Sequence, residues 1–241
     1  MRLGRLQANG LRIALLRHAP VACLGGLYLY AIGLKAARTP LWFDEIVTYH
    51  IADLGGPRAI VEALWNKADN HPPLDFLVRG LSMSLFGGSE LAFRLPSIAA
   101  VLVGALCLYL FVLRRTSVLP ALVAFSFPFA TMALRYSYEG RGYAFLMASM
   151  CLALLAWQLA SEKQSIARLA FLAVCLSLGP YSHYYGVLNY APIAVGEALR
   201  CWERRRVCWP IAACIAVSLA LLAPLVPPAL HAAEFSHHFW T

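Results

Sequence analysis

The sequence predicts an all-α fold, a polytopic transmembrane helix bundle, and three observations support this fold class. Of the 241 residues, 61% are hydrophobic and only 13% are charged, whereas about 25% of the residues in a soluble domain are charged. The mean hydropathy is +0.65, and the apolar residues gather in stretches close to the ~20 residues that a bilayer-spanning helix needs. Basic residues occur in short clusters between these stretches, which is typical of cytoplasmic segments.

Seven apolar stretches are predicted to cross the membrane. They cover residues 19–37, 95–113, 117–135, 143–160, 167–183, 185–199 and 209–229. The continuous stretch 167–199 is divided in two because its centre, Pro180–Gly186, contains polar and aromatic residues. The later crossings favour an uncleaved N-terminal anchor, although the small residues near Ala36 would also suit the end of a cleaved signal peptide.

The stretch 72–88 is predicted to be an amphipathic helix on the membrane surface rather than a further crossing. It contains Asp75 and Arg79, and a charge at the bilayer centre is costly. The N-terminus and every basic cluster then lie on the cytoplasmic side: residues 2–17, 114–115, 163–168 and 200–206. Such clusters suit anionic headgroups, so we expect membrane lipids, and no nucleic acid, as partners.

The loop 38–93 is predicted to be extracytoplasmic, with further amphipathic pieces at 44–53 and 57–67. A long loop on an otherwise economical membrane protein is usually functional. It begins with the adjacent carboxylates of Asp44 and Glu45, behind two aromatic residues. Such a pair can serve as a general base, a metal ligand or a cation clamp. The alternative is the acidic first turn of a helix, which the helix dipole favours.

Two histidine-containing segments are predicted to reach the same membrane face. His71 lies in Asn70–Pro73 and could hydrogen-bond a phosphate, or the segment could simply be a capped helix start. His183 and Tyr184 form a polar turn that is either part of a site or an interfacial aromatic belt. Histidines in the tail 234–238 could bind a metal, although tail histidines seldom do so.

Residues 135–143 form the turn richest in polar groups between two predicted crossings. The segment combines the carboxylate of Glu139 with the guanidinium groups of Arg135 and Arg141, and it ends at Tyr143. Arginine binds phosphate through two parallel hydrogen bonds, so this composition favours an anionic ligand. An interfacial tyrosine belt with arginines reaching toward the headgroups is the alternative.

Six short motifs follow one another in order: Leu41–Glu45, Asn70–Leu74, Phe86–Glu90, Phe93–Ser97, Tyr136–Tyr143 and His183–Gly186. Together they resemble the polytopic glycosyltransferases of the C-type fold, in the protein O-mannosyltransferase and aminoarabinose transferase group (glycosyltransferase family 39-like). The resemblance covers the N-terminal catalytic half of that family. We therefore expect residues 1–241 to form one membrane-embedded module that lacks the usual C-terminal part.

The resemblance implies an inverting glycosyltransferase of the cell envelope, which moves a sugar from a polyprenyl-phosphate donor to a protein, lipid or glycan acceptor. Transfer would take place on the outer face of the cytoplasmic membrane. The resemblance makes Asp44 the catalytic carboxylate, beside Glu45, and Glu139 a second acid, with Arg135 and Arg141 near the lipid phosphate. The other substrate-binding residues that the topology places on this face are His71, Tyr143, His183 and Tyr184.

The donor already carries an activated phosphate ester, so no organic cofactor is expected, while the resemblance leaves room for a divalent metal ion. Two alternatives come from other functional classes. One is a membrane protein that binds or flips a lipid-linked sugar without turnover. The other is an unrelated transporter, which would carry polar residues or broken helices near the midplane, whereas the ionisable groups here gather at the ends of the crossings.

Overall fold

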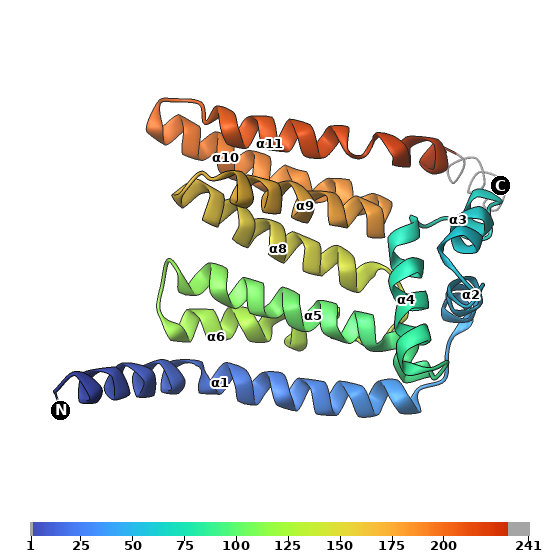
Figure 1. Ribbon diagram of the computed structural model, residues 1–241, viewed down its shortest axis with the longest axis horizontal. Helices are drawn as coiled ribbons and strands as arrows, with labels where there is room; N and C mark the ends of the chain where they lie inside the picture. The colour runs from blue at the N-terminus through green and yellow to red at the C-terminus, as the bar shows by residue number, and fades with distance from the viewer. Residues whose placement is uncertain (1, 231–241) are drawn as a thin grey trace.

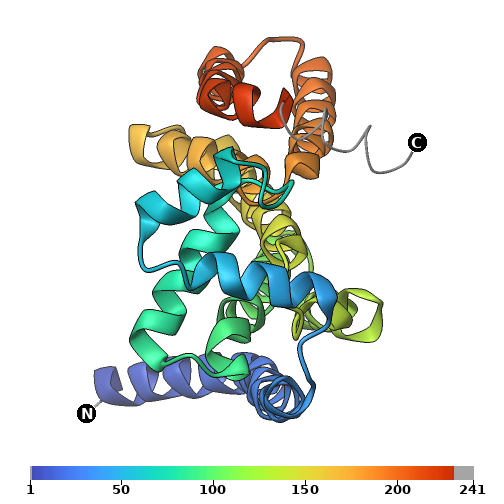
Figure 2. The same cartoon turned by 90° about the vertical axis from the view of Figure 1, so that its right-hand side faces the viewer.

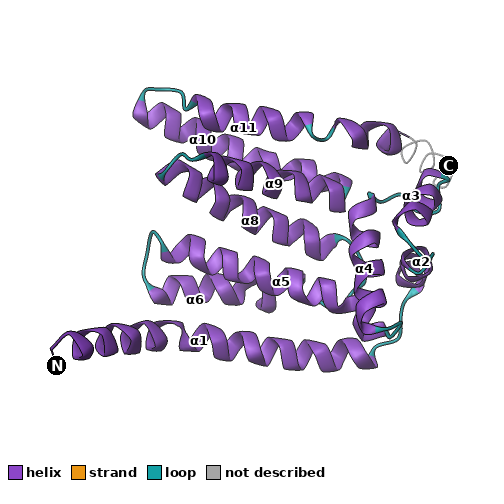
Figure 3. Ribbon diagram, in the orientation of Figure 1, coloured by secondary structure: helices purple, strands orange, loops and turns teal. Residues whose placement is uncertain are grey.

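The computed structural model describes the backbone of residues 2–230 and the side chains of residues 18–230, and every regular element in this part is a helix (Figure 3). The following helices lie side by side as a bundle (Figure 1): α1 (Arg2–Arg38), α5 (Glu90–Leu113), α6 (Val118–Ser126), α8 (Tyr143–Glu162), α9 (Ile166–Ser182), α10 (Tyr190–Arg204) and α11 (Trp209–Ala220). The predicted all-α bundle is confirmed.

Within residues 2–230, four helices are long and apolar enough to cross a membrane: His18–Arg38, Glu90–Leu113, Tyr143–Glu162 and Trp209–Leu230. Val118–Ala130 and Ile166–Ser182 are shorter apolar helices. The predicted crossing 185–199 is shifted, because a 3-10 helix, η2 (Tyr184–Asn189), precedes α10. The chain is therefore a polytopic membrane protein, and the number of seven crossings stays a prediction.

The predicted crossing 117–135 ends earlier than expected. Helix α6 stops at Ser126, and a 3-10 helix, η1 (Phe127–Ala130), and a short helix, α7 (Ala133–Tyr136), complete the segment. Pro128 explains the break, since a proline lacks the N–H that would continue the α-helical hydrogen bonds. After the interruption, residues 131–142 lie at the end of the bundle, and within them only α7 is helical.

Small residues allow the central helices to pack closely. Helix α8 packs between α5 and α9, and its alanines at 144, 148, 153, 156 and 160 are all buried. A Cβ atom added at Gly104 of α5 would lie 3.1 Å from the Ala148 Cα atom, so the two backbones approach as closely as they can. Contacts between small residues are the usual basis of helix association in membranes.

Three helices lie across one end of the bundle rather than along it (Figures 1 and 2). They are α2 (Phe43–Ala52), α3 (Pro57–Trp65) and α4 (Pro73–Phe86), close to the amphipathic pieces predicted within 38–93. We call this end of the bundle the site end. The opposite end carries the α5–α6, α8–α9 and α10–α11 turns, where the predicted cytoplasmic clusters 114–115, 163–168 and 200–206 lie.

The two charges of α4 are internal to the protein. Arg79 is fully buried and forms an ion pair with Asp75, with 2.8 Å between the closest atoms. The Arg79 guanidinium also donates to the carbonyl of Phe93 (2.9 Å), the hydroxyl of Ser97 (2.9 Å) and the carbonyl of Arg141 (3.1 Å). These contacts fasten α4 to α5 and to the segment that precedes α8, and they meet the requirement that buried charges be paired.

Candidate active site

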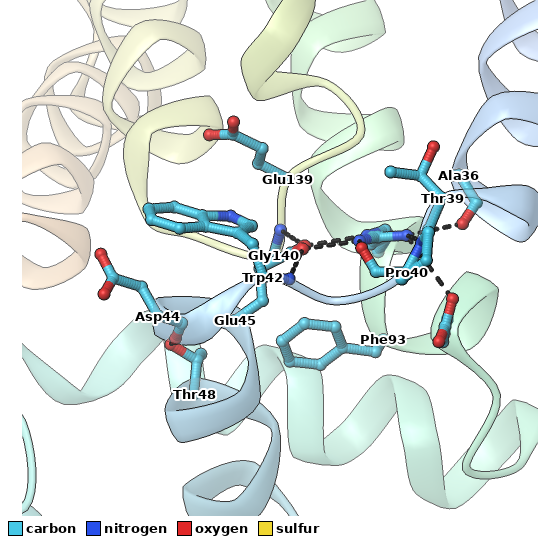
Figure 4. A network of polar contacts seen from close by, with 12 residues as sticks. Ala36, Thr39, Pro40, Trp42, Asp44, Glu45, Thr48, Phe93, Glu139 and Gly140 are labelled. Carbon is cyan, nitrogen blue, oxygen red and sulfur yellow. Dashed lines mark hydrogen bonds and ion pairs between the residues drawn. The ribbon is translucent and has the colours of Figure 1, made fainter.

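Glu45 lies in the first turn of α2 and is fully buried. Its Oε1 atom accepts hydrogen bonds from Arg94 Nε (2.8 Å) and from the Gly140 N–H (2.5 Å). Its Oε2 atom accepts from Arg94 Nη2 (2.5 Å) and from the Trp42 N–H (3.3 Å). Figure 4 shows this network between α2, α5 and the segment before α8. Both carboxylate oxygens are therefore occupied by donors of the protein itself.

Arg94 extends the network to the end of α1. Its guanidinium donates to the carbonyls of Ala36 (2.7 Å), Thr39 (2.5 Å) and Pro40 (3.1 Å). These three carbonyls follow or end helix α1, where backbone acceptors have no helical partner. The Glu45–Arg94 pair thus fixes the α1–α2 connection against α5, and charge-assisted hydrogen bonds of this kind are the strong ones.

Unlike the Glu45 carboxylate, the Asp44 carboxylate makes no hydrogen bond or ion pair with any of the described residues. It points away from the Glu45–Arg94 network (Figure 4). Its backbone is nevertheless fixed, since the Asp44 carbonyl accepts from Thr48 Oγ1 (2.9 Å) and from Arg141 Nη1 (3.4 Å). A half-buried carboxylate on a rigid backbone, without a partner of its own, can accept a proton or a ligand.

Gly140 allows the segment before α8 to approach Glu45. A Cβ atom at this position would lie 2.0 Å from the Phe93 ring, so only glycine fits between that ring and the carboxylate. Next to it, Glu139 is buried, its carboxylate is paired with Arg135 Nε, and its carbonyl accepts from Ser97 Oγ (2.7 Å). The Glu139 carboxylate is directed away from Glu45 (Figure 4).

Arg141 connects three segments of the candidate site. Its Nη1 atom donates to Thr48 Oγ1 (2.8 Å) and to Asp69 Oδ2 (3.0 Å), and its Nη2 atom lies 3.1 Å from His71 Nδ1. Burial alone would raise the pKa of Asp69, but the hydrogen bond with His71 and the charge of Arg141 outweigh it and lower this pKa. Asp69 is therefore a carboxylate at neutral pH and balances the arginine.

His71 is oriented by Asp69, two residues before it. The Asp69 Oδ1 atom lies 2.6 Å from His71 Nδ1, which is the shorter of the two contacts of this nitrogen. Because one ring nitrogen cannot donate to Asp69 and accept from Arg141 at once, the proton belongs on Nδ1. The other nitrogen, Nε2, is then the one available to a ligand.

Aromatic rings continue from His71 to the start of α8. The His71 and His183 rings lie 4.9 Å apart, His183 and Tyr143 lie 5.1 Å apart, and Tyr143 and Tyr136 lie 4.8 Å apart, measured between centroids. Tyr143 therefore connects the turn at residues 135–143 with His183 and, through His183, with His71.

His183 is held neutral. Burial, reinforced by the nearby His71 and Arg141, lowers its pKa to about 4. Its Nδ1 atom accepts the Tyr185 N–H at 3.2 Å, so the single proton of the neutral ring belongs on Nε2. His71 and His183 consequently present different chemistry, an acceptor nitrogen in the first and a donor in the second.

A cavity of about 200 Å³ adjoins this cluster on the side of α3 and of the chain after α11. Asp69, His71 and Tyr184 line it together with Trp65 and Tyr181. Tyr184, predicted as a binding residue, thus lies beside His71 and not beside Asp44. Aromatic faces combined with a few polar groups are typical of small-molecule sites.

Within residues 18–230, no group of three or more His, Cys, Asp or Glu side chains is arranged to hold a metal ion. The histidine-containing tail 234–238 lies outside the described residues.

The family of dolichyl-phosphate-mannose-protein mannosyltransferases matches residues 70–228, which is more than half of the chain. This chain belongs to that family. It is a membrane-bound glycosyltransferase of the mannosyltransferase type, as the resemblance of the motifs predicted. Comparisons with curated proteins and with solved structures gave no match.

The part that matches the mannosyltransferase family contains His71, Glu139, Arg141 and His183 and begins after Asp44. The roles of all the predicted site residues in this mannosyltransferase-family chain stay predictions. What the structure adds is their arrangement. Arg141 contacts the Asp44 backbone and the Asp69–His71 pair, while Arg135 pairs with Glu139 and with no other charged side chain of residues 18–230.

Three residues of the site were missed by the sequence analysis. Asp69 could have been found, because a carboxylate two residues before a histidine is well placed to orient the ring. Nothing in the sequence around Thr48 indicated a site residue, since its hydroxyl accepts a hydrogen bond from Arg141, which is 93 residues away. Arg94 stood in a recognised motif, but its partner Glu45 is 49 residues away in sequence.

Proposed function

We propose that this mannosyltransferase-family protein transfers a sugar from a polyprenyl-phosphate donor to an acceptor at the site end of the bundle, with inversion at the anomeric carbon. The observation that carries the proposal is the contrast between Asp44 and Glu45. One carboxylate lacks any partner among the described residues, and the adjacent one is fully occupied in positioning it.

Asp44 is the general base of the proposed reaction. As the acceptor hydroxyl attacks the anomeric carbon, its proton passes to the Asp44 carboxylate, and the bond between that carbon and the phosphate oxygen breaks. A single displacement from the face opposite the phosphate inverts the configuration. General base catalysis typically contributes about 10² to 10⁴-fold to the rate.

Glu45, which we had grouped with the catalytic residues, is better explained as a positioning residue. Its four hydrogen bonds leave no oxygen for a substrate. Glu139 retains a place near the reaction, because it lies two residues before Arg141, which donates to the Asp44 carbonyl. We propose that Glu139 orients Arg135 and, through it, the leaving phosphate.

Arg135 and Arg141 differ in how accessible their guanidinium groups are to a substrate phosphate. Arg135 has a side chain that is 56% exposed and a single charged partner, Glu139. Arg141 has a side chain that is 8% exposed and hydrogen-bonds Thr48 and Asp69. Arg135 is therefore the better candidate to stabilise the negative charge that develops on the leaving polyprenyl phosphate, while Arg141 holds the Asp44 backbone and the Asp69–His71 pair in place.

His71, Tyr143, His183 and Tyr184 make up the proposed binding surface for sugar and acceptor. The free His71 Nε2 accepts, the His183 Nε2–H donates, and the Tyr184 side chain lines the adjoining cavity. Hydroxyl groups of a sugar act as both donors and acceptors, so a surface with both kinds of group matches them.

The site end is proposed to face outside the cytoplasmic membrane. The opposite end carries the turns with Arg115, Lys163 and Arg205, and basic turns of this kind stay in the cytoplasm. A cysteine-free background with a single cysteine at Asp53 or at Arg115, treated with an impermeant thiol reagent, tests the orientation. Labelling from outside at position 53 is expected, and labelling at position 115 would reverse it.

The donor and acceptor are tested by incubating membranes that contain the protein with polyprenyl phosphates carrying radiolabelled sugars, mannose first. We expect label to move from the lipid fraction to protein, lipid or glycan. A purified protein that binds the donor lipid but moves no label with any acceptor fraction would instead be a lipid-linked-sugar binding protein. If it neither binds nor transfers, the proposal fails.

A further inference from the structure

A second polar cavity lies at the opposite end of the bundle, far from the candidate active site. It has a volume of about 250 Å³ and is formed between the α8–α9 turn and the α10–α11 turn. Three arginines line it, Arg200, Arg204 and Arg206, together with Gln164 and Trp209. It is much larger than the roughly 30 Å³ that one water molecule occupies, and no carboxylate lines it.

The local backbone explains why these arginines meet. Arg200 and Arg204 are one turn apart on α10, so they share a helix face. Helix α10 ends at Arg205, which adopts a left-handed conformation (φ 50°), and the Arg206 N–H bonds the Cys201 carbonyl (3.1 Å). This Schellman-type ending reverses the chain. It returns Arg206 to the cavity that Arg204 already lines, while Arg205 does not line it.

The charge of the cavity is only partly neutralised. Arg200 pairs with Glu197, which lies one turn earlier on α10. The guanidinium groups of Arg204 and Arg206 make no hydrogen bond or ion pair with any residue within 18–230. Glu203 is next to them in sequence but does not line the cavity. Two guanidinium groups therefore remain for a ligand, and their planar donors suit a phosphate group.

The position of the cavity indicates the source of that phosphate. The apolar segment Trp209–Leu230, one of the four candidate spans, begins at the cavity wall. Trp209 lines the cavity, and Trp202 follows the lining residue Cys201 in sequence. The two tryptophans are 73% and 84% exposed, and tryptophan is enriched at the membrane–water interface. A headgroup at the end of a bilayer-embedded helix lies at this level, whereas a free ion would need no such aromatic border.

We infer that this cavity binds the phosphate group of an anionic phospholipid in the leaflet opposite the candidate active site. The arginines Arg204 and Arg206 contact the phosphate, and the acyl chains lie along α11. This site is independent of the proposed sugar transfer, because it uses none of the residues at the site end. Basic pockets between membrane helices hold anionic headgroups in this way.

The test is native mass spectrometry of the full-length protein in a neutral detergent, with equal amounts of phosphatidylglycerol and phosphatidylcholine. We expect phosphatidylglycerol to bind preferentially. A surface charge contributes about 1 kcal/mol to such binding, or about 5-fold in affinity. Arg204→Gln and Arg206→Gln should each weaken binding about 5-fold, and the double variant about 30-fold. All of these side chains are exposed, so the variants should fold.

Arg205→Gln is the matched control, since it removes the same charge from the same turn without altering the cavity lining. We expect it to change the affinity less than 2-fold. Equal weakening by all three single variants would show a diffuse charged surface and overturn the inference. It would also be overturned by equal binding of the two lipids, or by glycerol phosphate binding as tightly as phosphatidylglycerol.

Discussion

Replacing Glu45 by glutamine is expected to destabilise the site end, whereas the corresponding change at Asp44, to asparagine, leaves the stability unchanged. Four N–H donors converge on the Glu45 carboxylate, two from Arg94 and one each from Gly140 and Trp42. A glutamine offers one oxygen to these donors and turns its NH₂ group toward the others. Arg94 would then be a buried cation without an anion.

The expected loss is large because the pair is buried. Each side chain of the Glu45–Arg94 pair is 1% exposed, and removing one partner of a buried ion pair typically costs about 3 to 5 kcal/mol. Asp44→Asn removes no hydrogen bond of the described protein, so the free energy of unfolding should change by less than about 0.5 kcal/mol. Both variants replace a carboxylate by the corresponding amide, and the two positions are adjacent in sequence.

The assay is denaturant titration of the purified protein in mixed micelles, followed by circular dichroism. Glu45→Gln should lower the free energy of unfolding by about 3 kcal/mol or more, and Asp44→Asn should superimpose on the wild type. Similar losses in both variants would refute the assignment of separate roles. A wild-type curve for Glu45→Gln would show that the network of Figure 4 does not hold the site together.

Three further predictions concern the surroundings of Asp44. Gly140→Ala should destabilise the protein by about 1 to 3 kcal/mol, since the new Cβ atom would collide with the Phe93 ring. Gly26→Ala is the control in the same denaturant titration and should leave the unfolding curve unchanged, because a Cβ atom there has nothing within 4 Å. Arg135→Gln should reduce kcat/KM for the lipid donor about 10-fold and leave the unfolding curve unchanged. Arg141→Gln should reduce kcat/KM and also lower the free energy of unfolding. Equal unfolding curves for the two variants would contradict this difference. His183 has a folded pKa of about 4 against 6.5 in the unfolded chain, so the unfolded state binds more protons between these values and stability falls as the pH drops from 6.5 to 4. The melting temperature of the wild type should therefore fall more over this window than that of His183→Gln, and parallel falls would argue against a neutral buried ring.

The helices were predictable where their signal was local. The spans at α1, α5 and α8 and the three helices across the site end follow from hydropathy and from charges such as Asp75 and Arg79. The 3-10 helices η1 and η2 were not predicted, although Pro128 is a local signal for the break that precedes the first of them. The burial of Arg79 was also beyond local reasoning, since its acceptors come from α5 and from the segment before α8.

In the candidate site, too, features with a local sequence signal were predictable and those that depend on distant residues were not. Residue type and topology were enough to bring Asp44, His71, Glu139 and His183 to one end of the molecule. They could not separate the roles of Asp44 and Glu45, because the partners that occupy Glu45 lie 49 and 95 residues away. The difference between Arg135 and Arg141 likewise depends on which of them folds against Thr48 and Asp69.

The most direct test of the account is the initial rate of sugar transfer from polyprenyl-phosphate mannose by the purified Asp44→Asn protein. Asp53→Asn, at the other end of the same helix, is the control. We expect Asp44→Asn to lower the rate by about 10² to 10⁴-fold while the donor still binds and the protein unfolds as the wild type does. A rate within a few-fold of the wild type would remove Asp44 from the mechanism.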